Sequence, residues 1–153
     1  MDNIAIEKVE RGSELAEELL RFVEQCSWIE ARDHIAQMIR EWVFTDWESM
    51  FVATMDGKIV GMASVMKTDY YPPQDIRPWV SRVFVSEAYR SQRISGKIIS
   101  HAVFSIVSNY KRTGNNFWDP LRRGSLVRFS GNTGTFGPWV IVGAFYALTE
   151  EAE

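Results

Sequence analysis

Three cationic side chains lie close together in the segment 89–97, and their spacing suits them to bind an anion. The segment reads YRSQRISGK and contains Arg90, Arg93 and Lys97 among small polar residues. An apolar run typical of a buried strand precedes it (79–85), and apolar residues at helical spacing follow from Ile94. The first turn of a helix has backbone N–H groups without partners and the positive end of the helix dipole. Small residues would let a phosphate reach these groups, so the segment predicts a site for a phosphorylated cofactor. The alternative is an ordinary strand-to-helix turn whose basic residues are solvated.

The longer stretch VFVSEAYRSQRISGKII, residues 83–99, resembles motif A of the GNAT superfamily of acyl-CoA N-acyltransferases. In that motif, the run R/Q-x-x-G-x-G/A joins the fourth strand to the third helix and wraps the pyrophosphate of acetyl-CoA. Arg90 matches the first position of the run. Arg93 stands where the first glycine is usual, and Ser95 stands where the second glycine or alanine is usual, with Gly96 one place later. The chain therefore has a side chain at a place where the family usually has bare backbone.

The resemblance implies that acetyl-CoA is the cosubstrate and that an acetyl group passes directly to a primary amine. Two groups of residues would bind the cofactor. Strand residues would pair with the pantetheine arm: Val83, Phe84 and Val85. Residues of the turn and of the helix start would hold the pyrophosphate: Arg90, Ser91, Gln92, Arg93, Ser95, Gly96 and Lys97. The acceptor would be a small-molecule or peptide amine.

Acetyl transfer to an amine requires that the amine loses a proton and that the departing thiolate gains one. The candidate bases are carboxylates near the central strand: Asp69, Asp75 and Glu87. The candidate acids are tyrosines: Tyr146, which is nearest to the family position, and Tyr110 on a predicted helix. Each of these residues has a plainer alternative role, as a solvated charge or a packed ring. Members of the superfamily often deprotonate the amine through water, so the reaction requires no single base.

The composition is that of a globular protein. The chain has 153 residues, of which 46% are apolar and 24% charged, and this length suits one domain over residues 1–153. A net charge of −3 argues against nucleic-acid binding through bulk charge. The longest apolar run, 138–148, is far shorter than the roughly 20 residues of a membrane span. The N-terminal segment lacks the features of a signal peptide.

The sequence predicts neither an internal disulfide nor a metal site. Cys26 is the single cysteine, and its register with the apolar face of a predicted helix favours a buried thiol. A cytoplasmic, reducing location agrees with this pattern. His34 and His101 lie on predicted helices without a second ligand four residues later, so no metal site is predicted.

The remaining segments predict an α/β (α+β) fold in which helices flank a mixed, mostly antiparallel central sheet. A strand is expected at 3–9, a helix from the N-cap Ser13 to about 25, and a second helix with Ile35, Met38, Ile39, Trp42 and Val43 on one face. Residues 50–66 predict a hairpin that turns at Asp56-Gly57. This order of elements resembles the GNAT fold over about residues 4–109.

The C-terminal third is atypical of that family. Residues 126–129 predict a strand, and 138–148 a buried strand or, from Val142, part of a helix. Too few residues remain for the family's closing strands, so we expect a divergent, rearranged or frame-shifted tail. An open sheet edge there would allow homodimer formation.

Two other functions stay open. One is a GNAT-like binding domain, a pseudoenzyme in which Arg93, Ser95 and the tail abolish use of acetyl-CoA. The other, more remote, is single-strand nucleic-acid binding by segment 111–129, where five Lys and Arg residues alternate with aromatic ones.

Overall fold

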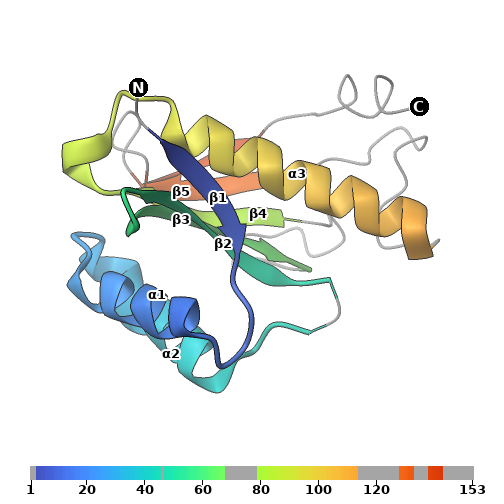
Figure 1. Cartoon of the computed structure of the whole chain (residues 1–153), viewed down its shortest axis with the longest axis horizontal. Helices are drawn as coiled ribbons and strands as arrows, with labels where there is room; N and C mark the ends of the chain where they lie inside the picture. The colour runs from blue at the N-terminus through green and yellow to red at the C-terminus, as the bar shows by residue number, and fades with distance from the viewer. Residues whose placement is uncertain (1–2, 46, 68–78, 114–127, 133–137, 143–153) are drawn as a thin grey trace.

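The computed structural model describes residues 3–45, 47–67, 79–113, 128–132 and 138–142. Six strands form one sheet in the order β1-β2-β3-β4-β5-β6 (Figure 1). The strands are β1 (Ile4–Lys8), β2 (Ser49–Met55), β3 (Lys58–Met66), β4 (Trp79–Val85), β5 (Arg128–Asn132) and β6 (Pro138–Val142). All neighbours are antiparallel except β4 and β5, which are parallel. The predicted mixed, mostly antiparallel sheet is confirmed.

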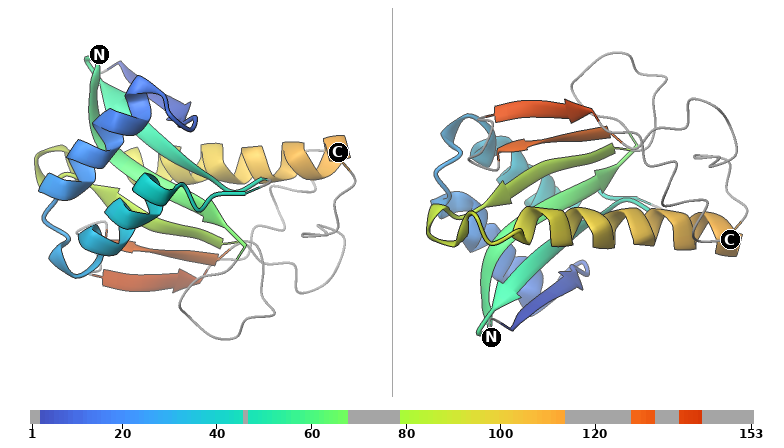
Figure 2. Two further views of the ribbon diagram at one scale, coloured as in Figure 1. Left: turned by 90° about the horizontal axis from the view of Figure 1, so that it is seen from below. Right: turned by 90° about the horizontal axis from the view of Figure 1, so that it is seen from above.

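Helices cover both faces of the sheet. Helices α1 (Glu14–Gln25) and α2 (Ile29–Glu41) lie on one face, and α3 (Ile94–Thr113) lies on the other (Figures 1 and 2). A short 3₁₀ helix, η1 (Glu87–Tyr89), connects β4 to α3. Each face has its own apolar core: Val83 and Val85 of β4 belong to the core under α3, whereas Phe84 belongs to the core under α1 and α2. Strand β4 is therefore buried on both faces.

Local sequence signals set most of these boundaries. The Ser13 side chain accepts a hydrogen bond from the Ala16 amide and caps α1, as predicted. At the hairpin, Asp56 and Gly57 have φ angles of 51° and 79°, the left-handed conformations that a type I′ turn requires. One boundary differs from the expectation. Helix α2 ends at Glu41, and Trp42 is its C-cap in left-handed backbone, so Val43 follows the helix and is exposed.

The last two strands are adjacent in the sheet and in the sequence. Strand β5 covers part of the segment predicted at 126–129, and β6 begins where the second strand was predicted. Only residues 133–137 separate β5 from β6. The alternative helix from Val142 lies outside the described residues.

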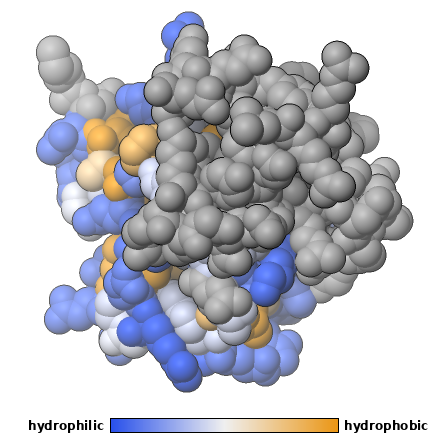
Figure 3. All heavy atoms as spheres, turned by 90° about the vertical axis from the view of Figure 1, so that its right-hand side faces the viewer, coloured by the Kyte–Doolittle hydropathy of each residue, from blue (hydrophilic) through white to orange (hydrophobic). Residues whose placement is uncertain are grey.

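Large exposed apolar side chains are scattered over the described part of the chain. They are Ile29 at the start of α2, Val43 after α2, and Phe104 on α3. Figure 3 shows small apolar groups separated by hydrophilic ones among the coloured residues of one side of the molecule. Within the described ranges, no helix is long and apolar enough to cross a bilayer.

One buried hydroxyl makes a stability test possible. Ser49 is 2% exposed, and its Oγ has no hydrogen-bond partner among the described residues. We expect Ser49→Ala to raise the free energy of unfolding by about 1 kcal/mol, because an unsatisfied buried hydroxyl is costly. Thermal unfolding should show an increase of about 3 °C. A decrease would show that the hydroxyl has a partner.

Candidate cofactor and active site

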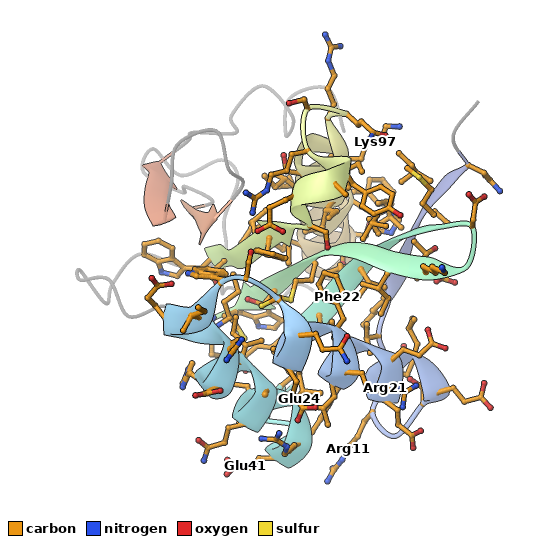
Figure 4. The ribbon with its side chains drawn as sticks, turned by 90° about the vertical axis from the view of Figure 1, so that its left-hand side faces the viewer. Arg11, Arg21, Phe22, Glu24, Glu41 and Lys97 are labelled. Atoms are coloured by element: carbon orange, nitrogen blue, oxygen red, sulfur yellow. The ribbon has the colours of Figure 1, made fainter. Side chains whose placement is uncertain are left out.

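A pocket of about 190 Å³ lies where β4 ends and α3 begins. Its lining residues come from both elements and from the connection between them: Val85, Tyr89, Arg90, Ser91, Arg93, Ile94 and Ser95. The structure thus brings together five of the predicted cofactor residues and adds Tyr89 and Ile94, which the sequence analysis did not select. The other predicted turn residues, Gln92, Gly96 and Lys97, are exposed and lie outside the lining. Figure 4 shows Lys97 at the α3 end of the molecule, away from α1 and α2.

The backbone of this pocket has glycine-like geometry without glycine. Ser91 has a φ of 68° and Arg93 a φ of 60°. Left-handed backbone favours glycine because other residues bring Cβ close to the neighbouring carbonyl, at a cost of roughly 1–2 kcal/mol. The side chain of Arg93 is exposed. Arg93 therefore keeps the turn that a glycine would form, and the cost is backbone strain.

The side chain of Arg90 is held against the wall of the pocket. Its Nε donates a hydrogen bond to the Val85 carbonyl at 2.8 Å, and its guanidinium lies 5.5 Å from the centre of the Phe84 ring. Its Nη2 is 3.6 Å from Glu87 Oε1 and, among the described residues, has no hydrogen-bond partner. Arg90 is thus fixed in place, and its buried Nη2 has an ion-pair partner in Glu87 but no hydrogen bond among the described residues.

An aromatic cluster joins this region to the α1–α2 turn. Trp28 stacks on Phe84 at 6.4 Å, and Phe22 meets the same ring edge-on at 6.0 Å. Figure 4 shows Phe22 between α1 and the sheet. Ser27 donates a hydrogen bond to Glu87 Oε1. The α1–α2 turn is therefore attached to both β4 and η1.

The thiol of Cys26 lies in the same turn and is buried, as predicted. Burial raises the pKa of Cys26. The Trp28 backbone and the charge of Arg32 oppose this rise less strongly, and the Glu87 carboxylate adds a still smaller increase. A raised pKa keeps the group a neutral thiol at pH 7, so it is a poor nucleophile.

Strand β4 contains a β-bulge that sequence reasoning missed. Between the pairs Ser64–Ser81 and Met62–Phe84, β3 advances by two residues while β4 advances by three. The register of β4 with β5 shifts in the same place. Arg82 is the inserted residue, with a φ of 54° and 8% of its surface exposed. The signal in the sequence was a polar pair, Ser81 and Arg82, inside an otherwise apolar strand.

A family model described as an acetyltransferase (GNAT) domain matches residues 46–124, which are 79 of the 153 residues. The chain belongs to the GNAT acetyltransferase family. The matched region includes β2, β3, β4, the basic pocket and α3.

Solved GNAT structures have the same fold at low sequence identity. An acetyltransferase from Streptococcus agalactiae 2603 has a TM-score of 0.57 and 14% identity, over 84% of this chain and 73% of that one. A GNAT acetyltransferase from Staphylococcus aureus MU50 has a TM-score of 0.55 and 15% identity, over 85% of this chain and 75% of that one. An aminoglycoside N-acetyltransferase in complex with CoA has a TM-score of 0.52 and 18% identity, over 71% and 72%. No curated protein matches this GNAT chain in sequence.

The strand residues predicted to pair with pantetheine already have neighbours in this GNAT sheet. Val83 is in register with Gly131 and Phe84 with Asn132, while β3 lies on the other side. Val85 lies at the end of β4 and lines the pocket. An extended cofactor arm could therefore pair with Val83 and Phe84 only after the end of β5 had separated from β4.

Of the candidate bases and acids in this GNAT domain, the structure describes the side chain of Glu87 alone. That carboxylate accepts the Ser27 hydrogen bond and is half-exposed at the end of β4. Asp69, Asp75 and Tyr146 lie outside the described residues, and Tyr110 falls within α3. The catalytic assignments stay predictions. Within the described ranges, no three His, Cys, Asp or Glu side chains are grouped to hold a metal.

Proposed function

We propose that this protein transfers an acetyl group from acetyl-CoA to a primary amine of a small molecule or peptide. The observation that carries the proposal is the cationic pocket between β4 and the start of α3, in a chain of the GNAT family. A related fold solved with CoA supports the choice of cofactor.

The pocket offers two kinds of donor to a pyrophosphate. The left-handed backbone at Ser91 and Arg93 turns the chain around the pocket, and the first amides of α3 have the positive end of the helix dipole. The guanidinium of Arg90, whose Nη2 makes no hydrogen bond among the described residues, would add a charge-assisted hydrogen bond once that nitrogen turns from Glu87 to the phosphate. Lys97, one turn further along the helix, would contribute long-range attraction only, since it does not line the pocket.

The reaction would proceed by direct attack. The neutral amine nitrogen forms a bond to the thioester carbon, and the C–S bond then breaks to give the amide and the CoA thiolate. The amine releases one proton to water or to a base such as Glu87, and the thiolate takes up one proton. The carbonyl oxygen gains negative charge during the attack, and backbone amides of the β4 bulge are the proposed donors to it.

Two observations concern the acceptor. The half-buried rings of Phe22 and Trp28 lie on the face of β4 opposite α3, where an amine could pack against them. Aminoglycoside acetyltransferases are among the proteins of similar fold. Both observations support a small-molecule amine as the first class to screen.

Thermal unfolding with and without millimolar acetyl-CoA, for the parent and for Arg93→Gly, tests the proposal. Without ligand, we expect Arg93→Gly to be more stable by about 1 kcal/mol, because glycine relieves the strain at a φ of 60°. With acetyl-CoA at a hundred times its Kd, the free energy of unfolding of both proteins should rise by about 2.7 kcal/mol.

The other outcomes separate the proposal from its alternative, a GNAT-like domain without transferase activity. The pairing of β5 with Val83 and Phe84 is the observation that favours the alternative. Stabilisation of Arg93→Gly alone would show that the arginine blocks the cofactor site. No stabilisation of either protein would overturn the proposal. The nucleic-acid alternative depends on the side chains of segment 111–129, and the structure does not describe these side chains.

A further inference from the structure

Glu87 presents a carboxylate to the arginine that lines the cofactor pocket. Its Oε1 is 3.6 Å from Arg90 Nη2, and its side chain is half-exposed. That distance is too long for a hydrogen bond, although the two opposite charges still attract each other. The buried Nη2 correspondingly makes no hydrogen bond among the described residues. The carboxylate thus compensates the charge of Arg90 without satisfying its donor nitrogen.

Of these two side chains, Glu87 is the one that can move. Arg90 is held at two points, since its Nε donates to the Val85 carbonyl and its guanidinium lies over the Phe84 ring. The half-exposed carboxylate belongs to the short helix η1 and can turn into solvent without loss of core packing. A buried charged donor left with no partner is costly. The carboxylate is therefore expected to leave Nη2 only when another anion replaces it.

Ser27 determines how closely the carboxylate approaches Arg90. From the α1–α2 turn, its hydroxyl donates a hydrogen bond to the same oxygen, Glu87 Oε1. This bond fixes Oε1 at a position beyond hydrogen-bond distance of Nη2. A loose and half-exposed ion pair contributes little free energy. A phosphate oxygen that reached Nη2 directly would make the stronger, charge-assisted hydrogen bond.

We propose that Glu87 is an internal competitor for the pyrophosphate at Arg90 and that Ser27 limits the strength of this competition. The inference rests on the proposed function, in which Arg90 binds the cofactor. Without cofactor, the Glu87 carboxylate holds the place of the anion, and on binding, Nη2 passes from the carboxylate to the pyrophosphate. Acetyl-CoA and the product CoA share this pyrophosphate, so the competition lowers the affinity for both by the same factor. Glu87 thus favours release of the product at the expense of cofactor affinity.

The two residues should have opposite effects on affinity, which titration calorimetry with acetyl-CoA at constant ionic strength measures. Glu87→Gln keeps an acceptor for Ser27 but removes the competing charge, so acetyl-CoA should bind about two- to fivefold more tightly. Ser27→Ala lets the carboxylate approach Nη2, so binding should weaken by a similar factor. In the double variant, affinity should equal that of Glu87→Gln, because no charged competitor is left for Ser27 to restrain. CoA should show the same changes.

The matched control is Glu24→Gln, which removes the carboxylate of another glutamate–arginine pair. Glu24 pairs with Arg40, and Figure 4 shows it among α1 and α2, away from Lys97 at the start of α3. Its affinity should stay parental, because salt screens a distant surface charge. An equal gain in this control would show that net charge, and not competition at Arg90, governs binding.

The remaining outcomes separate this inference from the proposed function. Binding of acetyl-CoA by neither the parent nor Glu87→Gln would overturn the proposed function, and the inference with it. Binding by the parent, with equal or weaker binding by Glu87→Gln, would overturn the competition alone. An equal effect of Ser27→Ala with and without the carboxylate would overturn the role given to Ser27. Thermal unfolding of each variant verifies that the comparison is made on folded protein.

Discussion

Replacing Phe84 with alanine is expected to lower the free energy of unfolding by about 3–5 kcal/mol, because it leaves a large cavity. Phe84 is 1% exposed and packs against two aromatic rings, Phe22 of α1 and Trp28 of the α1–α2 turn. Thermal unfolding followed by circular dichroism should show a decrease of about 10 °C. Arg90 also loses the ring on which its guanidinium lies. The substitution should therefore disturb both the packing of the core and the position of Arg90 in the pocket.

Phe104→Ala is the matched control, since it removes the same ring from an exposed position. Phe104 is 70% exposed on α3, so its replacement should change stability by less than about 0.5 kcal/mol. Equal melting temperatures for Phe84→Ala and the parent would contradict the central role given to this ring.

Replacing Arg90 with methionine is expected to weaken acetyl-CoA binding by at least about tenfold, if the proposed function is correct. The methionine side chain keeps an apolar stem against Phe84 but removes every donor nitrogen. Loss of a charge-assisted hydrogen bond to the pyrophosphate accounts for most of the effect. Titration calorimetry with acetyl-CoA measures the change directly.

The control for Arg90→Met is Arg40→Met, which removes one positive charge from α2. Arg40 is half-exposed and pairs with Glu24, so it has no role in the pocket. Affinity in this control should stay within about twofold of the parent. Equal weakening in both variants would mean that net charge, rather than the position of Arg90, governs binding.

The parts of the fold that local patterns encode could be predicted from the sequence. The Asp56-Gly57 turn requires two left-handed residues, and this pair provides them at low cost. The pocket could also be predicted, because the end of β4, the basic turn and the start of α3 are contiguous in the sequence. Contiguous residues are brought together by secondary structure alone.

The parts that depend on distant contacts could not be predicted. The stacking of Trp28 on Phe84 joins residues far apart in sequence. The β4 bulge depends on how β4 pairs with two other strands, so Arg82 in the strand sequence marked an unusual position but did not reveal the register shift. The backbone at Arg93 is a third example: the sequence showed that glycine was missing but not that arginine adopts the glycine-like conformation.

The pairing of β5 with β4 beyond the bulge has a consequence for cofactor affinity. In the proposed binding mode, only molecules in which Gly131 and Asn132 have left β4 can pair with the pantetheine arm. The observed Kd then equals the intrinsic Kd divided by the fraction of such open molecules. By linkage, the cofactor must in turn increase that fraction and expose the last amides of β5 to hydrogen exchange. Cofactor affinity and the stability of this edge of the sheet are two measures of one equilibrium.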